Sequence, residues 1–457
     1  MADFTSSFGQ DSVHPVPRDR RSMGFFSTFS LWVGANVVVT TVFTGMLLVP
    51  DLPYLQAIAI ILLGSLVGGV ALALTGNIGM RTGLPTMILT RGAFGHRGAA
   101  LPSAVNTIVL IGWSWIQAYM AGLSLDHAVE YLTGYSNVAL FTILTEIIVV
   151  VITIYGHRGI ERTENLIATA MLVLSVVVFG YMFMKFNIGN LISMAASEHP
   201  QLTVMVAFDI VVATAFSWLS SASDYNRNCR AERTAIVGTY FGYNVATLVA
   251  MGLGATVSGF SILGNMTQTY DPTELIGQAN PALGFVAAVV IFLSVVSTNV
   301  MALYSATMSY LAIFPGHRYW IPTAVMGIIA TAGAMLQNWL LEHFQNFLLM
   351  VGTLFIPVGA ILLTDYYILR RKNYDALEIV TGHKKLYWYR NGVNVRAYLA
   401  YIIGAAFAYY FSYVHTLSTG ATVLTFLLTS GVYWVLMKVG ASAEGESRAE
   451  YGLGEEA

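Results

Sequence analysis

Three segments of the sequence combine apolar stretches with polar side chains of the kinds that bind small molecules and cations. They run from Trp32 to Val37, from Ala213 to Arg227 and from Ser294 to Asn299. A bilayer core holds no water to satisfy stray polar groups, so polar residues there gather where they meet each other, a cavity or a ligand. We therefore expect the three segments to enclose one site, together with a fourth segment that carries Trp113 and Gln117.

The third segment offers ligands for a cation. Ser297 and Thr298 supply hydroxyl oxygens, Asn299 supplies an amide, and the carbonyl of Ser294 lies one helical turn earlier. Oxygen ligands of this kind suit a hard cation such as Na⁺. The alternative is that the hydroxyls only bond back to the preceding turn of their own helix. An amide is harder to satisfy in that way, so Asn299 favours the cation site.

The other two segments contain residues that can interrupt a helix. Gly34-Ala35-Asn36-Val37 would let the first helix unwind, and unwound carbonyls of a membrane helix can coordinate a cation. Small residues also let helices pack closely in membranes, so both interpretations stay open. The segment that ends at Arg227 contains four serines that could likewise interrupt a helix: Ser217, Ser220, Ser221 and Ser223.

An aromatic face and an amide together can hold a planar ring. Trp113 and Gln117 lie four residues apart, hence on one face of a helix. An indole stacks on a heterocycle while an amide pairs with the edge of the ring, as in base recognition. Phe216 or Trp218 would supply a second stacking face, whereas Trp115 points elsewhere. The alternative is a packing tryptophan beside a hydrogen-bonded glutamine.

Two acids inside apolar stretches are candidates for coupling. Acidic residues within a membrane span are costly and are often functional, including as proton carriers, so Glu146 is a candidate. The alternative for Glu146 is a protonated or paired structural acid. Asp209 is expected near the outer interface, where an acid is ordinary. Asp224 and Arg227 are expected to pair locally or with another loop, as a structural or gating latch.

The composition places the chain in a membrane. Of 457 residues, 56% are hydrophobic and 10% are charged, against about 25% charged residues in soluble proteins. Several apolar runs reach the roughly 20 residues that cross a bilayer as a helix. The sequence shows no phosphate-binding loop, metal-spaced His or Cys cluster or nucleophile elbow, which argues against an ATP-driven pump and an enzyme. The single Cys229 excludes an intramolecular disulfide.

The predicted fold class is an all-α polytopic membrane protein with twelve transmembrane helices. Residues 77–98 are too polar to span and are expected to form a loop with a short helix. The expected spans are 25–49, 55–76, 99–125, 138–156, 164–185, 203–223, 233–260, 281–312, 320–337, 343–369, 395–413 and 419–438. The predicted parts are a flexible tail without a cleavable signal peptide (1–22), a ten-helix transport core (23–372), a cytoplasmic loop (373–394), two accessory helices (395–438) and an acidic tail (439–457).

The distribution of basic residues sets the orientation. Of the 22 Lys and Arg residues, all except Lys185 fall in the two tails or the even-numbered loops. Cytoplasmic loops are enriched in Lys and Arg, so both termini are predicted to be cytoplasmic. Ten core spans divide into five plus five, and because five is odd the halves have opposite orientation, as in an inverted repeat. In such folds the first helix of each half is broken, which matches the interruptions in spans one and six.

The order and spacing of several motifs resemble the nucleobase–cation symporter-1 family over spans one to ten. This family includes purine–cytosine permeases, allantoin and hydroxymethylpyrimidine carriers and a bacterial hydantoin transporter. The matching pieces are Leu31 to Asn36 with Thr44-Gly45, Gly79 to Leu84 with Arg91 to Gly95, Gly112-Trp113, Ser217-Trp218 with Ser223 to Arg227, and Ser297 to Asn299 with Ala302 to Tyr304. Two departures argue against cytosine itself: Met301 replaces a second Asn of several cytosine carriers, and Val38-Val39 replace polar or aromatic residues of some members.

The resemblance implies a LeuT-like five-plus-five inverted repeat with two additional C-terminal helices. It implies that one planar heterocycle moves per cycle, together with Na⁺ or H⁺. The implied cation ligands are the carbonyls of Gly34, Val37 and Ser294 and the hydroxyls of Ser297 and Thr298. The implied substrate pocket consists of Val38, Trp113, Gln117, Phe216, Ser217, Ser220 and Asn299.

We therefore expect a secondary active transporter that imports a purine- or cytosine-type nucleobase, or a related planar N-heterocycle, by Na⁺ symport with alternating access. One alternative is a proton-coupled carrier of a hydroxymethylpyrimidine, allantoin or hydantoin-type compound, and another is a channel or membrane receptor. The expected location is the inner (plasma) membrane. The expected partners are the lipid bilayer and a small planar heterocycle, with neither nucleic acid nor an obligatory protein partner.

Overall fold

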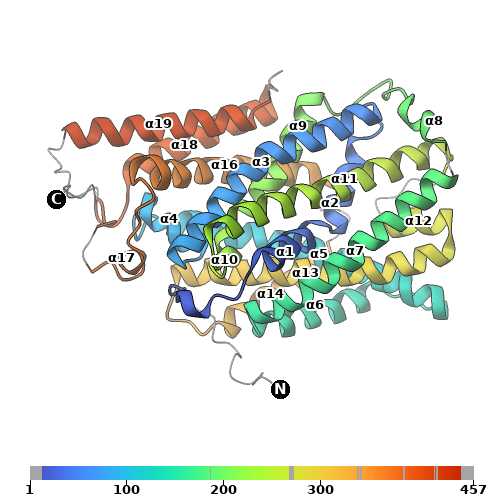
Figure 1. Ribbon diagram of the computed structural model, residues 1–457, viewed down its shortest axis with the longest axis horizontal. Coiled ribbons are helices and arrows are strands. Elements are labelled where there is room, and N and C mark those ends of the chain that lie inside the picture. The colour runs from blue at the N-terminus through green and yellow to red at the C-terminus, as the bar shows by residue number, and fades with distance from the viewer. Residues whose placement is uncertain are drawn as a thin grey trace.

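The structure is a computed structural model in which every named element of the described residues is helical, and most of the long helices run along one axis (Figure 1). It describes residues 13–443 except 186, 267–271, 337–338, 340–341, 384–385, 416 and 418–419. The side chains of 157–166, 272, 275, 279 and 440–443 are outside this description. Residues 1–12 and 444–457, which belong to the two predicted tails, also lie outside the described residues.

Each of the twelve predicted spans contains a helix. Eight helices of the described residues are long and apolar enough to cross a membrane, and the bent pair α1 and α2 makes a ninth. Three shorter apolar helices, α6, α9 and α14, lie at the remaining predicted places. The total of twelve crossings stays a prediction. The long elements are α1 (Phe25–Asn36), α2 (Val39–Leu48), α3 (Tyr54–Thr82), α5 (Ala100–Thr133), α6 (Val138–Ile154), α7 (His157–Lys185), α9 (Val204–Leu219), α11 (Thr239–Leu263), α13 (Pro281–Ile313), α14 (Trp320–Ala334), α16 (Phe344–Leu363), α18 (Val395–Tyr409) and α19 (Thr422–Ala443), and the short ones are α4 (Thr86–Phe94), α8 (Ile188–Ile192), α10 (Ala222–Asn226), α12 (Pro272–Ala279) and α17 (Ala376–Thr381).

Two helices are broken where the sequence predicts it. The axes of α1 and α2 differ by 58° across a gap at Val37 and Val38. In the sixth span, α9 gives way to α10 across Ser220 and Ser221. The third polar segment is different, because α13 runs without interruption through Ser294–Asn299. The polar defect of span eight is therefore carried by side chains on an intact helix.

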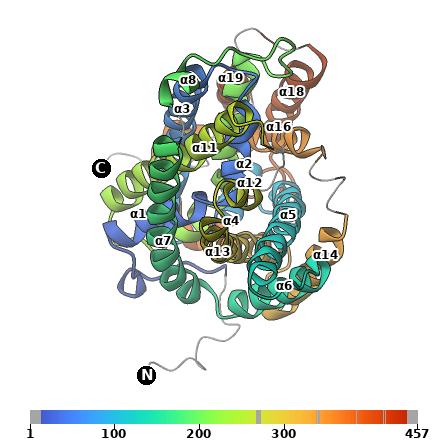
Figure 2. The same ribbon diagram turned by 90° about the vertical axis from the view of Figure 1, so that its right-hand side faces the viewer.

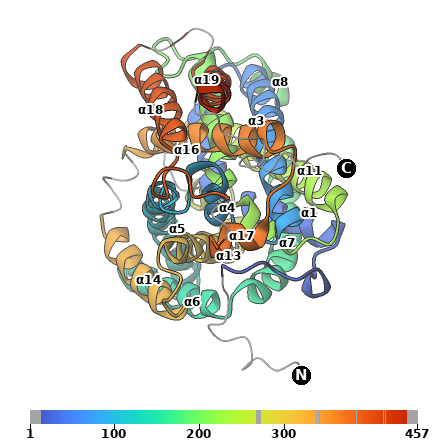
Figure 3. The same ribbon diagram turned by 90° about the vertical axis from the view of Figure 1, so that its left-hand side faces the viewer.

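The two halves of the core repeat one pattern in opposite directions. In the first half the short helix α4 precedes the third span, α5, and in the second half the short helix α12 precedes its counterpart, α13. Figure 3 shows α4 at one end of the bundle, beside α17, and Figure 2 shows α12 at the other end. This placement agrees with the five-plus-five inverted repeat.

The second span is longer than predicted. The polar residues that begin at Asn77 were expected to leave the helix, yet α3 continues to Thr82 before the short helix α4. Protein neighbours bond to these residues, since the Asn77 amide nitrogen donates to a Glu232 carboxylate oxygen over 3.0 Å. A side chain at Gly79 would collide with the backbone of Ser223, so α3 and α10 are in close contact. Polarity therefore marks a helix–helix contact here, and the prediction of a loop for 77–82 is wrong.

The described part of the N-terminal tail is packed against the core. Val13 is buried, and the amide of Val16 donates to the Gly83 carbonyl over 3.0 Å. The guanidinium group of Arg21 donates to the carbonyls of Val16 and Met80, at the end of α3. The prediction of a flexible tail is therefore wrong for residues 13–22, because backbone carbonyls at the end of α3 bind this segment.

The loop between the core and the accessory helices is folded over the same end of the bundle (Figure 3). It contains α17, and Arg91 of α4 donates to the carbonyls of Ile379 and Val380 over 3.3 and 3.2 Å. Arg91 also donates to the carbonyl of Ala312, at the end of α13, over 2.8 Å. One buried guanidinium group thus joins the carboxyl ends of two helices, where a cation is stabilised by the helix dipoles.

The accessory helices α18 and α19 are joined to the core by two buried acids. Asp209 of α9 accepts hydrogen bonds from the amides of Ala421 and Thr422, at the start of α19. In the middle of α19, the hydroxyl of Tyr433 donates to Asp365 over 2.8 Å, and Asp365 lies 3.8 Å from Arg370. Asp209 therefore binds the start of α19, and Asp365 joins the middle of α19 to the core.

Helices α2 and α11 touch through their backbones, which yields a test of the packing. A methyl group at Gly254 would collide with the carbonyl of Val42. Gly254→Ala should lower the free energy of unfolding by about 1–3 kcal/mol, because the helices must separate. The measurement is the apparent melting temperature of the purified protein in detergent. The control is Gly431→Ala on α19, where no atom lies within 4 Å of the added methyl group. Equal melting temperatures for the two variants would contradict the close contact.

Candidate functional site

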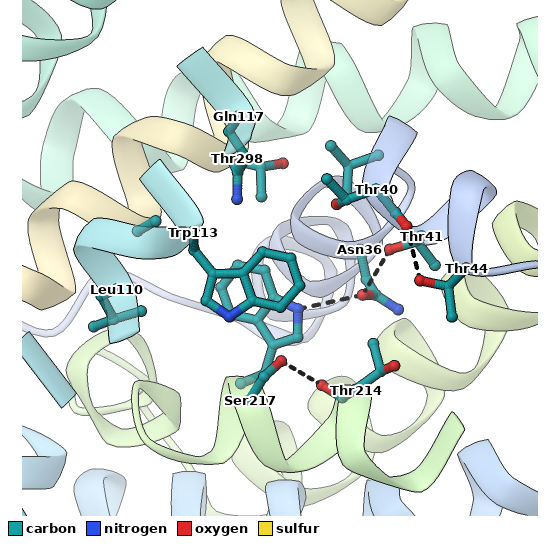
Figure 4. Close-up of a pocket in the computed structure, with 13 residues that line it drawn as sticks. Asn36, Thr40, Thr41, Thr44, Leu110, Trp113, Gln117, Thr214, Ser217 and Thr298 are labelled. Atoms are coloured by element: carbon teal, nitrogen blue, oxygen red, sulfur yellow. Dashed lines mark hydrogen bonds between the residues drawn. The ribbon is translucent and has the colours of Figure 1, made fainter. Parts of the chain in front are cut away.

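A small cavity lies where the α1–α2 break meets α5, α9 and α13 (Figure 4). Its volume is about 30 Å³, which is room for water-sized contents. Five residues of the implied substrate and cation sites line it: Val38, Trp113, Gln117, Ser217 and Thr298. The other lining residues are Asn36, Thr40, Thr41, Thr44, Leu110, Thr214, Trp218 and Ala302. Four chain segments far apart in the sequence thus meet at one cavity.

Trp113 and Gln117 both reach the cavity from α5. Trp113 is held by aromatic edges of α16, with ring centroids 5.1 Å from Phe347 and 6.0 Å from Phe344. Gln117 is buried, and its Oε1 has no hydrogen-bond partner among the described residues. A fixed indole and an unused amide oxygen are suited to stacking on a ring and accepting a hydrogen bond from its edge.

Of the two aromatic candidates on α9, Trp218 lines the cavity and Phe216 does not. The indole nitrogen of Trp218 donates to Asn36 Oδ1 over 3.2 Å. Phe216 packs on Phe426 of α19 with ring centroids 6.0 Å apart. Two helical residues separated by one position point about 200° apart, so both could not face the same cavity. The placement of Phe216 in the substrate pocket is therefore corrected.

Asn36 and a group of threonines are lining residues that the predicted site omitted. Asn36 accepts hydrogen bonds at Oδ1 from Trp218 and from Thr41, the latter over 3.3 Å, and its amide donates to Thr247 over 2.7 Å. Thr40, Thr41 and Thr44 all belong to α2, directly after the break. Their position after a predicted break, and that of Thr214 one turn before Ser217, were the available signals.

Three of the five predicted cation ligands, Val37, Ser294 and Thr298, are linked by hydrogen bonds at the α1–α2 break. Ser294 Oγ donates to the Val37 carbonyl, outside its own helix, over 2.8 Å. Thr298 Oγ1 donates to the Ser294 carbonyl over 3.1 Å, which is the bond to the preceding turn of its own helix named above as the alternative; its lone pairs remain available as acceptors. Gly34 belongs to the last turn of α1, where carbonyls have no partner within the helix. Ser297 is buried on the same helix as Ser294 and Thr298. The hydroxyl lone pairs and these carbonyls form a neutral set of oxygen donors, which fits a hard monovalent cation.

Asn299 and Ser220 lie outside the cavity. Asn299 follows Thr298 by one residue, so its side chain is turned about 100° around α13. It accepts from Ser114 Oγ over 2.6 Å and donates to Glu146 Oε2 over 2.7 Å. Ser220 Oγ donates to the Ser217 carbonyl over 3.0 Å. Their assignment to the substrate pocket is corrected for this conformation, because both polar groups are bonded within the protein.

Asp224 and Arg227 attach α10 to two different helices. Asp224 Oδ1 accepts from the backbone amide of Thr86, at the start of α4, over 2.8 Å, and Thr86 Oγ1 accepts from the amide of Ser223 over 3.0 Å. Arg227 donates to the hydroxyl of Tyr304 on α13 over 2.9 Å. The geometry agrees with the expectation that Asp224 pairs with another segment. Whether the contacts act as a gate stays a prediction.

Comparison with known sequences identifies the family. The family described as permeases for cytosine and purines, uracil, thiamine and allantoin matches residues 15–436. The hydantoin permease of Microbacterium maritypicum is 25% identical over 451 residues, which cover 95% of this chain and 91% of the relative. The purine-uracil permease of Arabidopsis thaliana is 24% identical over 480 residues, with 95% and 79% covered. The cytosine permease of Escherichia coli (strain K12) is 26% identical over 364 residues, with 79% and 82% covered.

Solved structures share the fold. A nucleobase-cation-symport-1 family transporter in a closed conformation with bromovinylhydantoin bound has a TM-score of 0.83 at 21% identity, covering 97% of this chain and 99% of that one. The outward-open state of a Na⁺-coupled sialic acid symporter has a TM-score of 0.67 at 11% identity, covering 96% and 93%. The LeuT-like architecture is confirmed. The chain belongs to the family of permeases for cytosine, purines, uracil, thiamine and allantoin, and it is a membrane transporter rather than an enzyme.

Proposed function

We propose that this permease imports a nucleobase or a related planar N-heterocycle by Na⁺ symport with alternating access. The observation that carries the proposal is the position of Thr298, which lines the small-molecule cavity. The same residue is bonded to the Ser294 carbonyl, and Ser294 is bonded in turn to the Val37 carbonyl at the α1–α2 break. A cation bound by these oxygens would therefore fix one wall of the substrate cavity.

The small volume of the cavity supports a cycle with moving walls. A ring cannot enter a space of about 30 Å³ unless covering residues move apart. On one side Phe43 of α2 stacks on Phe344 of α16, with ring centroids 5.0 Å apart, and Phe344 also contacts Trp113. On the other side the hydroxyl of Tyr225 donates to the Met301 carbonyl. We propose that each contact closes one side of the cavity, so that release of one at a time gives alternating access.

The orientation follows from the ends of the bundle. The start of α1 and the end of α19 lie at the same end as α4, α10 and α17 (Figure 1). One of the basic residues predicted to be cytoplasmic, Arg91, belongs to α4 at this end. Because cytoplasmic loops are rich in Lys and Arg, we place this end in the cytoplasm and the protein in the inner (plasma) membrane. Transport of the external substrate toward this end is import.

A proton-coupled carrier of a hydantoin-, allantoin- or hydroxymethylpyrimidine-type compound is the second candidate. The observation that favours it is a buried acid, Glu146, bonded to Asn299 next to the cation ligands. Cavity residues Trp113 and Gln117 suit hydantoins as well as nucleobases, since both present planar amide edges. The hydantoin permease relative covers nearly the whole chain.

Thermal stability against a ligand panel tests the proposed function directly. Detergent-purified protein is heated with nucleobases, hydantoins and pyrimidine precursors, each in NaCl and in choline chloride. A compound that binds the folded state raises its stability by mass action. We expect a shift with a planar heterocycle that requires NaCl. A shift of equal size in both salts would favour the proton-coupled carrier, and no shift with any compound would contradict the substrate class.

Removal of the shared hydroxyl should weaken substrate and cation together. Thr298→Ala removes a proposed Na⁺ ligand. Linkage requires that the factor by which bound Na⁺ raises the substrate affinity equals the factor by which bound substrate raises the Na⁺ affinity, so any loss of this coupling lowers both affinities. We expect a loss of about tenfold in each apparent affinity, measured by uptake into proteoliposomes across Na⁺ and substrate concentrations. Thr307→Ala on the same helix is the control, because that hydroxyl bonds to Leu303 and Thr323 outside the cavity. Unchanged substrate affinity in Thr298→Ala would refute the shared position.

The two tryptophans of α5 offer a matched pair for the stacking face. Trp113→Ala should raise the substrate KM about tenfold or more, because base–aromatic stacking contributes about 1–3 kcal/mol per base. Trp115 packs against Gly333 of α14, away from the cavity. Trp115→Ala should therefore lower stability without raising KM. The measurement is initial uptake rate against substrate concentration. Similar KM values for the two variants would remove Trp113 from the substrate site.

A further inference from the structure

Three buried polar side chains form a ring behind the candidate site. They are Ser114 of α5, Glu146 of α6 and Asn299 of α13, each at most 1% exposed. Ser114 Oγ donates to Asn299 Oδ1 over 2.6 Å, and Asn299 Nδ2 donates to Glu146 Oε2 over 2.7 Å. The remaining side of the ring joins Ser114 Oγ and Glu146 Oε1 at 3.4 Å. None of the three lines the cavity.

The number of hydrogen atoms in the ring indicates the state of the acid. Ser114 has one hydroxyl hydrogen, and its shortest contact gives that hydrogen to Asn299. The contact between Ser114 and Glu146 Oε1 then has a hydrogen only if the carboxyl group carries it. If the amide of Asn299 is turned over, the bonds run in the opposite direction and the carboxyl group again supplies one hydrogen. A protonated Glu146 closes the ring in either direction, whereas a carboxylate leaves it open.

Among the described residues, no charged side chain forms an ion pair with Glu146. A bare charge inside a span is costly, which favours the neutral acid. The titratable groups on the described parts of the neighbouring helices are Tyr119, Asp126, His127, Glu130 and Tyr131 on α5, Tyr304 and Tyr310 on α13, Tyr181 and Lys185 on α7, and none on α14. Asp126, the acid of α5 nearest in sequence to Ser114, lies twelve residues away, about 18 Å along the helix.

The ring joins the two helices that carry the substrate and cation residues. Ser114 follows Trp113 on α5, and Asn299 follows Thr298 on α13. We propose that Glu146 is a positioning residue: as a neutral acid, it bridges Ser114 and Asn299 and thereby holds Trp113 in register with Thr298. The inference rests on the proposed function for its transport readout. It assigns Glu146 a role that does not require it to carry protons during the cycle.

Replacement by glutamine separates this role from proton transfer. In Glu146→Gln, the amide carbonyl accepts from Asn299 and the amide nitrogen donates to Ser114, so the neutral ring is kept without a titratable group. In Glu146→Ala the buried groups of Ser114 and Asn299 lose their partner. Thr145→Ala is the matched control, because Thr145 is a buried neighbour on α6 whose hydroxyl donates to the carbonyl of Phe141 on its own helix.

The experiment measures uptake by proteoliposomes that contain full-length wild type or one of these three variants. We expect Glu146→Gln and Thr145→Ala to keep the wild-type substrate KM and cation dependence, and Glu146→Gln to keep the wild-type pH profile. Glu146→Ala should raise both the substrate KM and the half-saturating cation concentration about tenfold, with a smaller change in kcat. Loss of gradient-driven uptake in Glu146→Gln would overturn the proposal in favour of a proton carrier. Wild-type values in Glu146→Ala would overturn it altogether.

A second measurement keeps this inference separate from the proposed function. The apparent melting temperature of each purified variant needs no substrate. If the ring stabilises the fold, Glu146→Gln should have the melting temperature of wild type. Glu146→Ala should have a lower melting temperature than Thr145→Ala. If wild type transports no heterocycle but this order of melting temperatures holds, the proposed function fails while the neutral bridge stands. A Glu146→Gln protein that melts as low as Glu146→Ala would refute the neutral bridge.

Discussion

The break between α1 and α2 frees backbone groups from their helical hydrogen bonds, and hydrocarbon offers these groups no hydrogen-bond partner. Other helices of the core must therefore supply the partners. The Val37 carbonyl accepts from Ser294 of α13. Asn36, at the end of α1, is bonded to Trp218 of α9 and Thr247 of α11. The break therefore persists only because three other helices supply donors and acceptors at this depth. A site for polar ligands follows, because the same groups can bind a cation or a ring.

On two helices, one residue borders the cavity and the next residue bonds to a neighbouring helix. On α13, Thr298 borders the cavity while Asn299 is turned toward α5 and α6. On α5, Trp113 borders the cavity while Ser114 belongs to the buried ring. A helix turns about 100° per residue, so a polar pair serves two different neighbours. The side of each helix that faces away from the cavity therefore also makes specific polar contacts.

Polar stretches that look like connections are folded parts of one end of the bundle. The segment 373–394 contains α17, and Arg91 joins it to the end of α13. Residues 77–82 extend α3 because α10 lies against Gly79. In each case a charged or amide side chain finds backbone carbonyls or other polar groups within the protein. Polarity in a membrane protein therefore marks either water or an internal contact, and only packing distinguishes them.

Composition and apolar run length determined the membrane class from the sequence, since too few charges remain to solvate a soluble surface. The order of polar interruptions placed the breaks in spans one and six, helical spacing put Trp113 and Gln117 on one face, and the polar segment 294–299 pointed to Thr298. Only the tertiary structure decided between Phe216 and Trp218, and it turned Asn299 and Ser220 away from the cavity. It also showed that α13 is unbroken and added Asn36 and the threonines of α2. The physical reason is that a local pattern fixes which residues share a helix face, whereas the rotation of each helix about its axis depends on every neighbour that packs against it.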